Sequence, residues 1–189
     1  MFVKIVPKLN RAVKENKYYS DYFHETVEKY PNKVAILFED RKMTFKELNE
    51  MSNRIANLLR TSTGLRHGDT VAIMMENCPE YVAVSLALFK IGVSGAYINH
   101  NLRGDALAHC IRIANSSGVF FSSTLADAVS DVLPNLDPSL SEMLYCVEGD
   151  CSLPQAKILE TEIMNSSPSN PPPVSGKSAK GSETLCDNQ

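Results

Sequence analysis

Residues 68–98, GDTVAIMMENCPEYVAVSLALFKIGVSGAYI, decide the fold of this chain. The apolar run at residues 71–75 has the length and composition of a buried strand. A helix is predicted next, with Pro79 in its first turn and Gly92 at its end, because these residues are favoured at those two positions. A second apolar run at residues 96–98 predicts another strand. Strand, helix and strand joined by short connections are typical of a parallel sheet.

The same alternation continues toward the C-terminus. Helices are predicted at residues 105–115 and 125–133, and strands at residues 119–122 and 143–147. Crossovers between parallel strands are right-handed, and their helices cover both faces of the sheet. We therefore expect an α/β fold in which helices flank a parallel sheet.

Polar residues follow the predicted strands. Ligands of α/β sheets bind where the carboxyl ends of the strands meet. The residues at these ends are Glu76, Asn77, residues 99–101, residues 122–124 and Glu148. A ligand of this chain is expected among them.

The residues before this sheet predict a helix and a small β-hairpin. Apolar and aromatic residues recur at helical spacing in residues 21–30. Two short apolar runs around a turn at residues 39–42 predict the hairpin. Thr44 and Glu47 have the spacing of a capping box, so an amphipathic helix should begin after Thr44 and end before Gly64.

Charge is unevenly distributed along the 189 residues. The net charge is −3, but residues 1–17 contain five basic residues and one acidic residue, which leaves 14 basic and 21 acidic residues for the rest. A nucleic-acid surface needs clustered basic charge on the folded part, so we expect no nucleic acid as a partner. Residues 1–17 predict a basic juxtamembrane or interfacial segment with peripheral membrane contact, and a frayed basic terminus is the alternative.

Composition divides the chain into three parts. Residues 1–17 are the basic segment, residues 18–150 are the α/β domain, and residues 151–189 are of low complexity and expected to be disordered. The last of these parts is too poor in apolar residues to offset the entropy of ordering. The five cysteines lack CxxC spacing, which argues against a disulfide framework and for a reducing compartment.

No catalytic motif is found in the sequence. Residues 176–178, GKS, match the end of a phosphate-binding loop, but Pro171 stands where its first glycine is required. There is no G-x-S-x-G elbow, and four scattered histidines supply no third ligand for a metal site. His109 and Cys110 are expected to form a buried packing pair rather than a catalytic dyad. The residues alone therefore predict no catalytic residue and no metal site.

Four segments carry a resemblance to a known family. They are residues 30–39 (YPNKVAILFE), 43–48 (MTFKEL), 68–77 (GDTVAIMMEN) and 96–110 (AYINHNLRGDALAHC). Together they resemble the fatty acid transport protein family, the long-chain and very-long-chain fatty acid CoA ligases of the adenylate-forming, AMP-binding superfamily. The last segment is the most specific, because the wider superfamily usually has a proline-bearing segment after the position of Asn99. The resemblance covers roughly residues 18–149.

The resemblance implies a fold, a reaction and a set of cofactors. The fold is the N-terminal subdomain of an adenylate-forming enzyme, and this chain would form only part of that subdomain. The family uses ATP, Mg and CoA to convert a fatty acid to acyl-AMP and then to acyl-CoA, coupled to fatty acid uptake. It implies association with the cytosolic face of a membrane, the endoplasmic reticulum or the plasma membrane. Arg103 is the one residue expected to face CoA, with a solvated loop arginine as the alternative.

The sequence departs from the family in the part that binds nucleotide. The family holds ATP with a loop of the type TSGTTG, and neither that loop nor the later catalytic lysine occurs in these 189 residues. We therefore expect an N-terminal fragment that is inactive alone and binds none of these cofactors tightly. The alternative is a non-catalytic truncated product that acts as an interaction module, with a homo-oligomer as one assembly, or as a dead-end fragment. Another adenylate-forming branch, luciferase-like or peptide-synthetase, is a further alternative.

Overall fold

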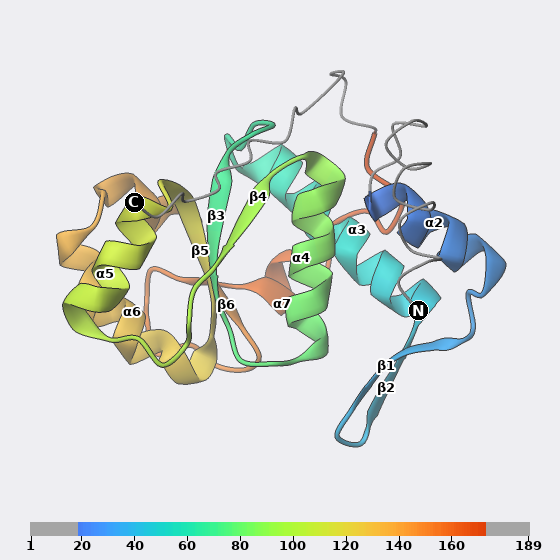
Figure 1. Ribbon diagram of the computed structural model, residues 1–189, viewed down its shortest axis with the longest axis horizontal. Helices are drawn as coiled ribbons and strands as arrows, with labels where there is room; N and C mark the ends of the chain where they lie inside the picture. Colours follow the sequence, from blue (N-terminus) through green and yellow to red (C-terminus); the bar gives the residue numbers. More distant parts are fainter. Residues whose placement is uncertain (1–18, 173–189) are drawn as a thin grey trace, which may run out of the picture.

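A central sheet of five parallel strands organises the computed structural model, which describes residues 19–172 (Figure 1). The order of the strands is β4-β3-β5-β6-β7, and each neighbouring pair is parallel. Their bounds are Thr70–Met74 for β3, Ser94–Tyr97 for β4, Ser116–Ser122 for β5, Leu144–Val147 for β6 and Lys157–Ile158 for β7. The predicted α/β class is confirmed. The predictions for residues 1–17 and 173–189 lie outside the described residues.

Helices cover both faces of this sheet (Figure 1). The α-helices of the described residues are α2 (Tyr19–Lys29), α3 (Phe45–Ser62), α4 (Pro79–Ile91), α5 (Gly104–Ile113), α6 (Ala126–Val132) and α7 (Leu159–Glu162), of which α2 packs against α3 and α4. Within residues 19–172 there are also three short 3-10 helices, η2 (Ser123–Leu125), η3 (Leu133–Asn135) and η4 (Pro138–Met143). In Figure 1, α4 and α3 lie on one side of the strands, and α5 and α6 lie on the other.

Successive residues of β3 point to opposite faces of the sheet and are buried in two different hydrophobic clusters. Val71 and Ile73 are buried in the cluster that contains the apolar faces of α3 and α4. Ala72 and Met74 are buried in a second cluster with residues of α5 and α6. Because side chains alternate across a strand, a fully apolar run is what a strand covered on both faces requires.

The helix ends follow the predicted local rules. At the start of α3, Thr44 Oγ1 accepts from the Glu47 amide at 3.2 Å, and the Glu47 carboxylate accepts from the Thr44 amide at 2.7 Å. This is the capping box that the sequence predicts. Helix α4 has Pro79 at its start, and Gly92 ends it with a φ of 71°, which glycine adopts without steric cost.

A small antiparallel hairpin precedes α3. It consists of β1 (Val34–Phe38) and β2 (Arg41–Thr44), and it confirms the hairpin predicted from the sequence. In Figure 1 it projects from the start of α3, and its Arg41 meets the first turn of α4 and the end of β6. Leu37 near its tip is 70% exposed.

The boundary predicted at residue 150 is wrong, because ordered structure continues to residue 172. Strand β7 pairs with β6, and Leu159 of α7 is only 1% exposed. Residues 164–172, which we call the strap, then lie against α3 and accept hydrogen bonds from its side chains. A strand of two residues leaves no periodic signal, and the strap is held by polar contacts rather than apolar burial. Composition therefore could not reveal either.

Candidate functional site

The carboxyl ends of β3 and β5 are joined by hydrogen bonds. The Ser122 hydroxyl accepts from the Glu76 amide at 3.0 Å. The Thr124 hydroxyl donates to the Glu76 carboxylate at 3.0 Å. These residues follow different strands, so the sheet brings them together at one edge, as the sequence predicts.

Glu148 stands at the carboxyl end of the next strand, β6. Its backbone is left-handed, with a φ of 66°, and its amide donates to the Glu160 carboxylate at 2.9 Å. Its carbonyl accepts from the Ser123 hydroxyl, which ties the turn after β6 to the end of β5. The hollow beside this turn, about 480 Å³, is also lined by Arg41 and Glu80.

An ion pair between the hairpin and α4 lies beside the carboxyl edge of the sheet. Arg41 of β2 donates to both carboxylate oxygens of Glu80, which lies in the first turn of α4 and is only 7% exposed. The Arg41 guanidinium also lies 3.7 Å from the carboxylate of Glu148. The hydrogen bond to Glu80 raises the pKa of Arg41 above its ordinary value. The buried carboxylate is thus neutralised by the hairpin.

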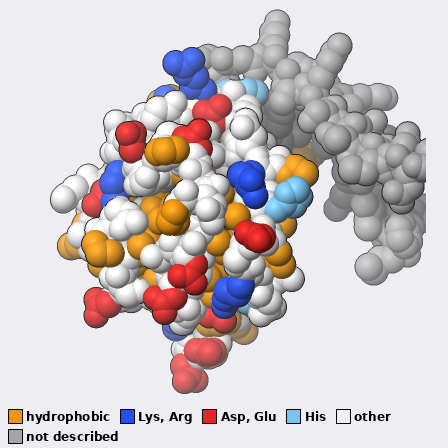
Figure 2. Space-filling model, turned by 90° about the vertical axis from the view of Figure 1, so that its left-hand side faces the viewer, with side chains coloured by type: hydrophobic (Ala, Val, Ile, Leu, Met, Phe, Trp, Pro, Cys, Tyr) orange, Lys and Arg blue, Asp and Glu red, His pale blue; other side chains and the backbone are white. Residues whose placement is uncertain are grey.

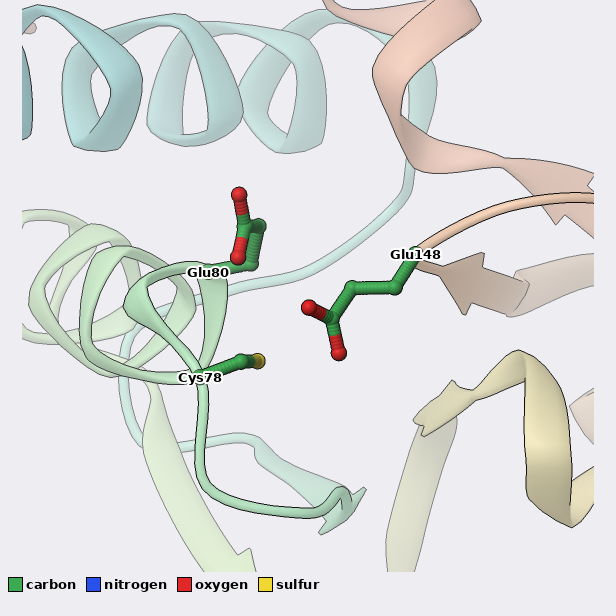
Figure 3. A group of neighbouring side chains, drawn as sticks. All are labelled: Cys78, Glu80 and Glu148. Atoms are coloured by element: carbon green, nitrogen blue, oxygen red, sulfur yellow. The ribbon is translucent and has the colours of Figure 1, made fainter. Parts of the chain in front are cut away.

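Cys78 completes a cluster with Glu80 and Glu148 (Figure 3). The ligand atoms of the three lie within 4.8 Å of one another, and Figure 3 shows the Glu148 side chain reaching toward the other two. The Cys78 sulfur accepts from the Tyr81 amide at 3.3 Å, and burial raises the pKa of the thiol to about 12. A protonated thiol is a poor nucleophile. Because Arg41 also takes both oxygens of Glu80, the cluster has the character of a structural ion pair.

Arg103 lies apart from this cluster, at the N-cap position of α5. Its guanidinium donates to the carbonyls of His100 at 2.6 Å and Leu102 at 2.8 Å, within its own loop. The side chain is exposed and follows the end of β4, so it stands on the carboxyl-end side of the sheet.

A larger hollow of about 850 Å³ lies at the opposite, amino edge of the sheet. Its walls include residues at the start of β5, such as Ser116 and Ser117, and the ends of α3 and α5. The buried hydroxyl of Ser116 has no hydrogen-bond partner among the described residues. The sequence gives no signal for this hollow, because hydroxyl residues at strand starts are common.

Two features of these sites differ from the sequence-based predictions. His109 is exposed and Cys110 is half-buried, so the predicted buried pair is wrong. Both residues lie on the side of α5 away from its buried face, which Leu107, Ala108 and Ile111 form. The pairing of Arg41 with Glu80 was not predicted, because the two residues are 39 positions apart and belong to no motif.

Charged side chains are dispersed over the face shown in Figure 2. Acidic, basic and hydrophobic side chains are interspersed there, and the basic ones do not form a continuous patch. Among the described residues, no helix is both long and apolar enough to cross a membrane.

A protein-family profile described as AMP-binding enzyme matches residues 23–179 of the chain. Long-chain fatty acid transport protein 2 of Rattus norvegicus is 39% identical over 123 residues, which are 65% of this chain and 20% of that protein. Long-chain fatty acid transport protein 6 of Homo sapiens is 32% identical over 155 residues, 82% of this chain and 24% of that protein. The chain thus spans about a fifth to a quarter of the length of these relatives.

Solved structures share the fold. A putative long-chain-fatty-acid CoA ligase from Rhodopseudomonas palustris matches with a TM-score of 0.71 and 24% identity over 80% of this chain and 37% of that chain. An anthranilate CoA ligase in complex with anthranoyl-AMP matches with a TM-score of 0.73 and 19% identity over 79% of this chain and 28% of that one. The parallel sheet with its flanking helices is therefore the fold of the matched part of these ligases. With most of its length matched by the family profile, the chain belongs to the family of AMP-binding enzymes.

Proposed function

We propose that the chain forms the N-terminal part of a long-chain fatty acid CoA ligase of the fatty acid transport protein type. The observation that carries this proposal is the 39% identity with long-chain fatty acid transport protein 2 over 123 residues. The reaction is activation of a fatty acid carboxylate by ATP to acyl-AMP, followed by transfer of the acyl group to CoA. Long-chain fatty acid and CoA are the proposed substrates.

The proposed role of these residues in that reaction is structural. The hydrogen bonds among Glu76, Ser122 and Thr124 hold the carboxyl edge of the sheet together. The pair of Arg41 with Glu80 fixes the hairpin against the same edge. Such a scaffold can position catalytic groups supplied by other parts of an enzyme.

Nucleotide, CoA and Mg are proposed as cofactors of the full-length family and not as tight ligands of these 189 residues. ATP binding requires backbone amides that cradle phosphate oxygens, and the sequence contains no such glycine-rich loop. The acidic cluster fits Mg poorly, because Arg41 already occupies the Glu80 carboxylate. In the full-length family, ATP would supply the adenylyl group that joins the fatty acid carboxylate, with pyrophosphate as the leaving group, and Mg would offset the charge of the phosphates.

A chimaera tests the proposal. Residues 19–172 would replace the matching segment of rat long-chain fatty acid transport protein 2, and ATP-dependent palmitoyl-CoA formation would be measured. We expect the chimaera to retain activity, because the replaced segment supplies scaffold. A folded chimaera with no activity would contradict the proposal. The isolated chain of 189 residues is expected to form no acyl-CoA, and formation of acyl-CoA by that chain would refute its inactivity.

Arg103 is proposed to face CoA in the complete enzyme. Its support is its exposed place after β4, on the carboxyl-end side of the sheet. In the chimaera, Arg103→Ala should raise the KM for CoA about tenfold and leave acyl-adenylate formation unchanged. The matched control is Arg66→Ala, a change of an exposed arginine on the amino side of β3. An unchanged KM for CoA would contradict this proposal, and Arg103 would then only stabilise its own loop through its hydrogen bonds to His100 and Leu102.

Residues 1–17 are proposed to contact the cytosolic face of a membrane, of the endoplasmic reticulum or the plasma membrane. The support is their basic and apolar composition. Flotation with vesicles containing phosphatidylserine at low salt tests this. The chain should float with the vesicles, and changing the five basic residues to glutamine should abolish flotation. Equal flotation of both proteins would contradict the proposal.

A second candidate function is a non-catalytic interaction module that pairs with another copy of the chain. One observation favours it: β4 lies at the edge of the sheet, next to β3 only, and Tyr97 at its end is 51% exposed. Exposed strand edges are templates for pairing. Sedimentation of the purified chain over a range of concentrations tests it. This function would be favoured if the chain forms a homo-oligomer that the substitution Gly95→Pro abolishes. A chain that stays monomeric at all concentrations would rule it out.

A further inference from the structure

The polar side of α3 holds the strap, residues 164–172, through a dense set of hydrogen bonds. Four side chains of α3 donate them, from Asn53, Arg54, Asn57 and Arg60. These positions recur at helical spacing and form one stripe along the helix. The donors of the stripe therefore face a single segment of chain that lies more than 100 positions further on.

All but one of these hydrogen bonds from α3 have a main-chain carbonyl of the strap as the acceptor. Asn57 donates to the carbonyls of Ser167 and Ser169, at 2.9 Å each. The other carbonyl acceptors are Pro168 at 2.7 Å from Asn53, Ser166 at 2.5 Å and Met164 at 3.3 Å from Arg54, and Pro172 at 2.7 Å from Arg60. One further bond reaches a side chain, Asn170 Oδ1, at 2.9 Å from Asn53. Recognition thus depends on backbone shape much more than on side-chain identity.

Proline makes the strap a suitable partner for a stripe of donors. The strap contains Pro168, Pro171 and Pro172, which have no amide hydrogen and offer only carbonyl acceptors. Proline-rich chains are also stiff, so little conformational entropy is lost when they bind. Asparagine amides and arginine guanidinium groups supply the matching donors.

Lys90 of α4 fixes the direction of one of these donors. Its ammonium donates to Asn53 Oδ1 at 2.6 Å and also to Asn49 Oδ1 at 2.8 Å and Ser52 Oγ at 2.7 Å. An ammonium has no acceptor, so it can meet only the oxygen of the Asn53 amide. The amide nitrogen is then directed toward the strap, and the stripe is pre-organised by a residue of a different helix.

The strap is held without an apolar anchor. Within residues 164–172, only Ser166 and Pro171 are half-buried, and the others are exposed. Of its seven hydrogen bonds from α3, four are exposed and three are part-buried. A hydrogen bond of this kind contributes about 1 kcal/mol, and the exposed ones exchange readily with water. A segment held in this way can leave its site and be replaced by a segment with the same backbone pattern.

We propose that the polar stripe of α3 is a binding site for uncharged, proline-rich peptide segments, and that the strap is its resident and displaceable ligand. A partner protein with such a segment would dock on α3 in place of the strap. The resident strap competes at an effective concentration in the millimolar range, because it is tethered to the same chain. The site therefore opens to a partner when the strap is released.

The test uses a labelled peptide with the sequence of residues 164–172, MNSSPSNPP, and fluorescence anisotropy. The full chain is compared with a variant in which residues 165–172 are replaced by a Gly-Ser sequence of equal length. We expect saturable binding to the variant and binding at least tenfold weaker to the unchanged chain. Adding Asn57→Ala to the variant should weaken binding about tenfold, since two hydrogen bonds are lost. Lys46→Ala, an exposed change on the same helix, should have no effect.

Two altered peptides test whether the affinity for the stripe depends on the serine side chains or on the prolines of the strap. Replacing the three serines with alanine should change the affinity less than twofold, while replacing the three prolines with glycine should weaken it at least fivefold. Arg60→Ala serves as a second variant if Asn57→Ala reduces helicity. The proposal is overturned if the Gly-Ser variant shows no saturable binding, or if neither α3 substitution weakens it. Equal binding to the unchanged chain would also overturn it, since the peptide would then bind elsewhere.

Discussion

Arg41 and Glu80 form a two-point ion pair that attaches the β-hairpin to the first turn of α4. The Arg41 guanidinium donates to both oxygens of a carboxylate whose side chain is only 9% exposed, while the arginine itself is 49% exposed. A carboxylate in this position would be costly without a partner, because burial removes its hydration. The hairpin thus contributes a charge that the sheet domain needs.

Removing the arginine should therefore destabilise the domain. Arg41→Ala is expected to lower the free energy of unfolding by about 2 kcal/mol, because the Glu80 carboxylate stays buried without its donors. The loss should be smaller than for a fully buried pair, since half of Arg41 is open to solvent. Urea denaturation followed by circular dichroism measures the change.

Two further variants separate the pair from the general effect of charge. Lys42→Ala changes an exposed neighbour on the same strand and should alter stability by less than about 0.5 kcal/mol. The double variant Arg41→Met with Glu80→Leu removes both charges and should recover most of the loss. Equal destabilisation by Arg41→Ala and Lys42→Ala would contradict this account.

The parts of the fold that the sequence predicts correctly are those with a local or periodic cause. The capping box at Thr44 and the end of α4 at Gly92 are fixed by residue type and spacing. The run from Val71 to Met74 is apolar because both faces of β3 are covered. Each of these features can be predicted from a few neighbouring residues.

The features that the sequence does not reveal depend on distant partners. Arg41 meets Glu80 only because the hairpin folds back on α4. Asn53 and Asn57 resemble ordinary polar residues of an exposed helix face until the strap lies beside them. Strand β7 is ordered by its pairing with β6 and not by its own two residues. Long-range polar contacts of this kind leave no periodic pattern.

Lys90 should make stability rise with pH in alkaline solution. Burial lowers the pKa of Lys90 from its ordinary 10.5 to about 8. Between about pH 8 and 10.5, the unfolded state therefore binds more protons at this residue than the folded state does. The free energy of unfolding should rise with pH in this window, by up to about 1.4 kcal/mol per pH unit.

The contribution of Lys90 is isolated by comparison with Lys90→Met. Burial raises the pKa of Cys78 and of Cys146 to about 12, and such thiols lower stability as pH rises, because the folded state keeps protons that the unfolded state releases. Urea denaturation at pH 7.5, 8.5 and 9.5 should give a less positive slope for Lys90→Met than for the unchanged chain. Identical slopes would show that Lys90 titrates outside this window.

The capping box of α3 gives a prediction at acidic pH. Thr44→Ala should cost about 1 kcal/mol of stability, because the Glu47 amide at the start of the helix loses its acceptor. The hydrogen bonds from Thr44 lower the pKa of Glu47, so their contribution is present above about pH 4.5 and lost as pH falls through the lowered value. Denaturation curves at pH 7 and pH 3 should show that Glu47→Gln is destabilising mainly at pH 7. A constant difference at both pH values would contradict the assignment.

Gly118 should tolerate no side chain, although its φ is not left-handed. A Cβ at this position would lie 2.0 Å from Met143 Cε and 2.7 Å from the Met143 carbonyl oxygen. The methionine side chain could move, but the carbonyl belongs to the turn that leads into β6, so Gly118→Ala must displace backbone between two paired strands. We expect the free energy of unfolding to fall by about 2 kcal/mol.

Gly64→Ala is the matched control, since nothing lies within 4 Å of its Cβ position. Its free energy of unfolding should stay within about 0.5 kcal/mol of that of the unchanged chain or lie above it. If thermal denaturation gave the two variants the same midpoint, the close contact between β5 and the residue before β6 would not constrain the sheet.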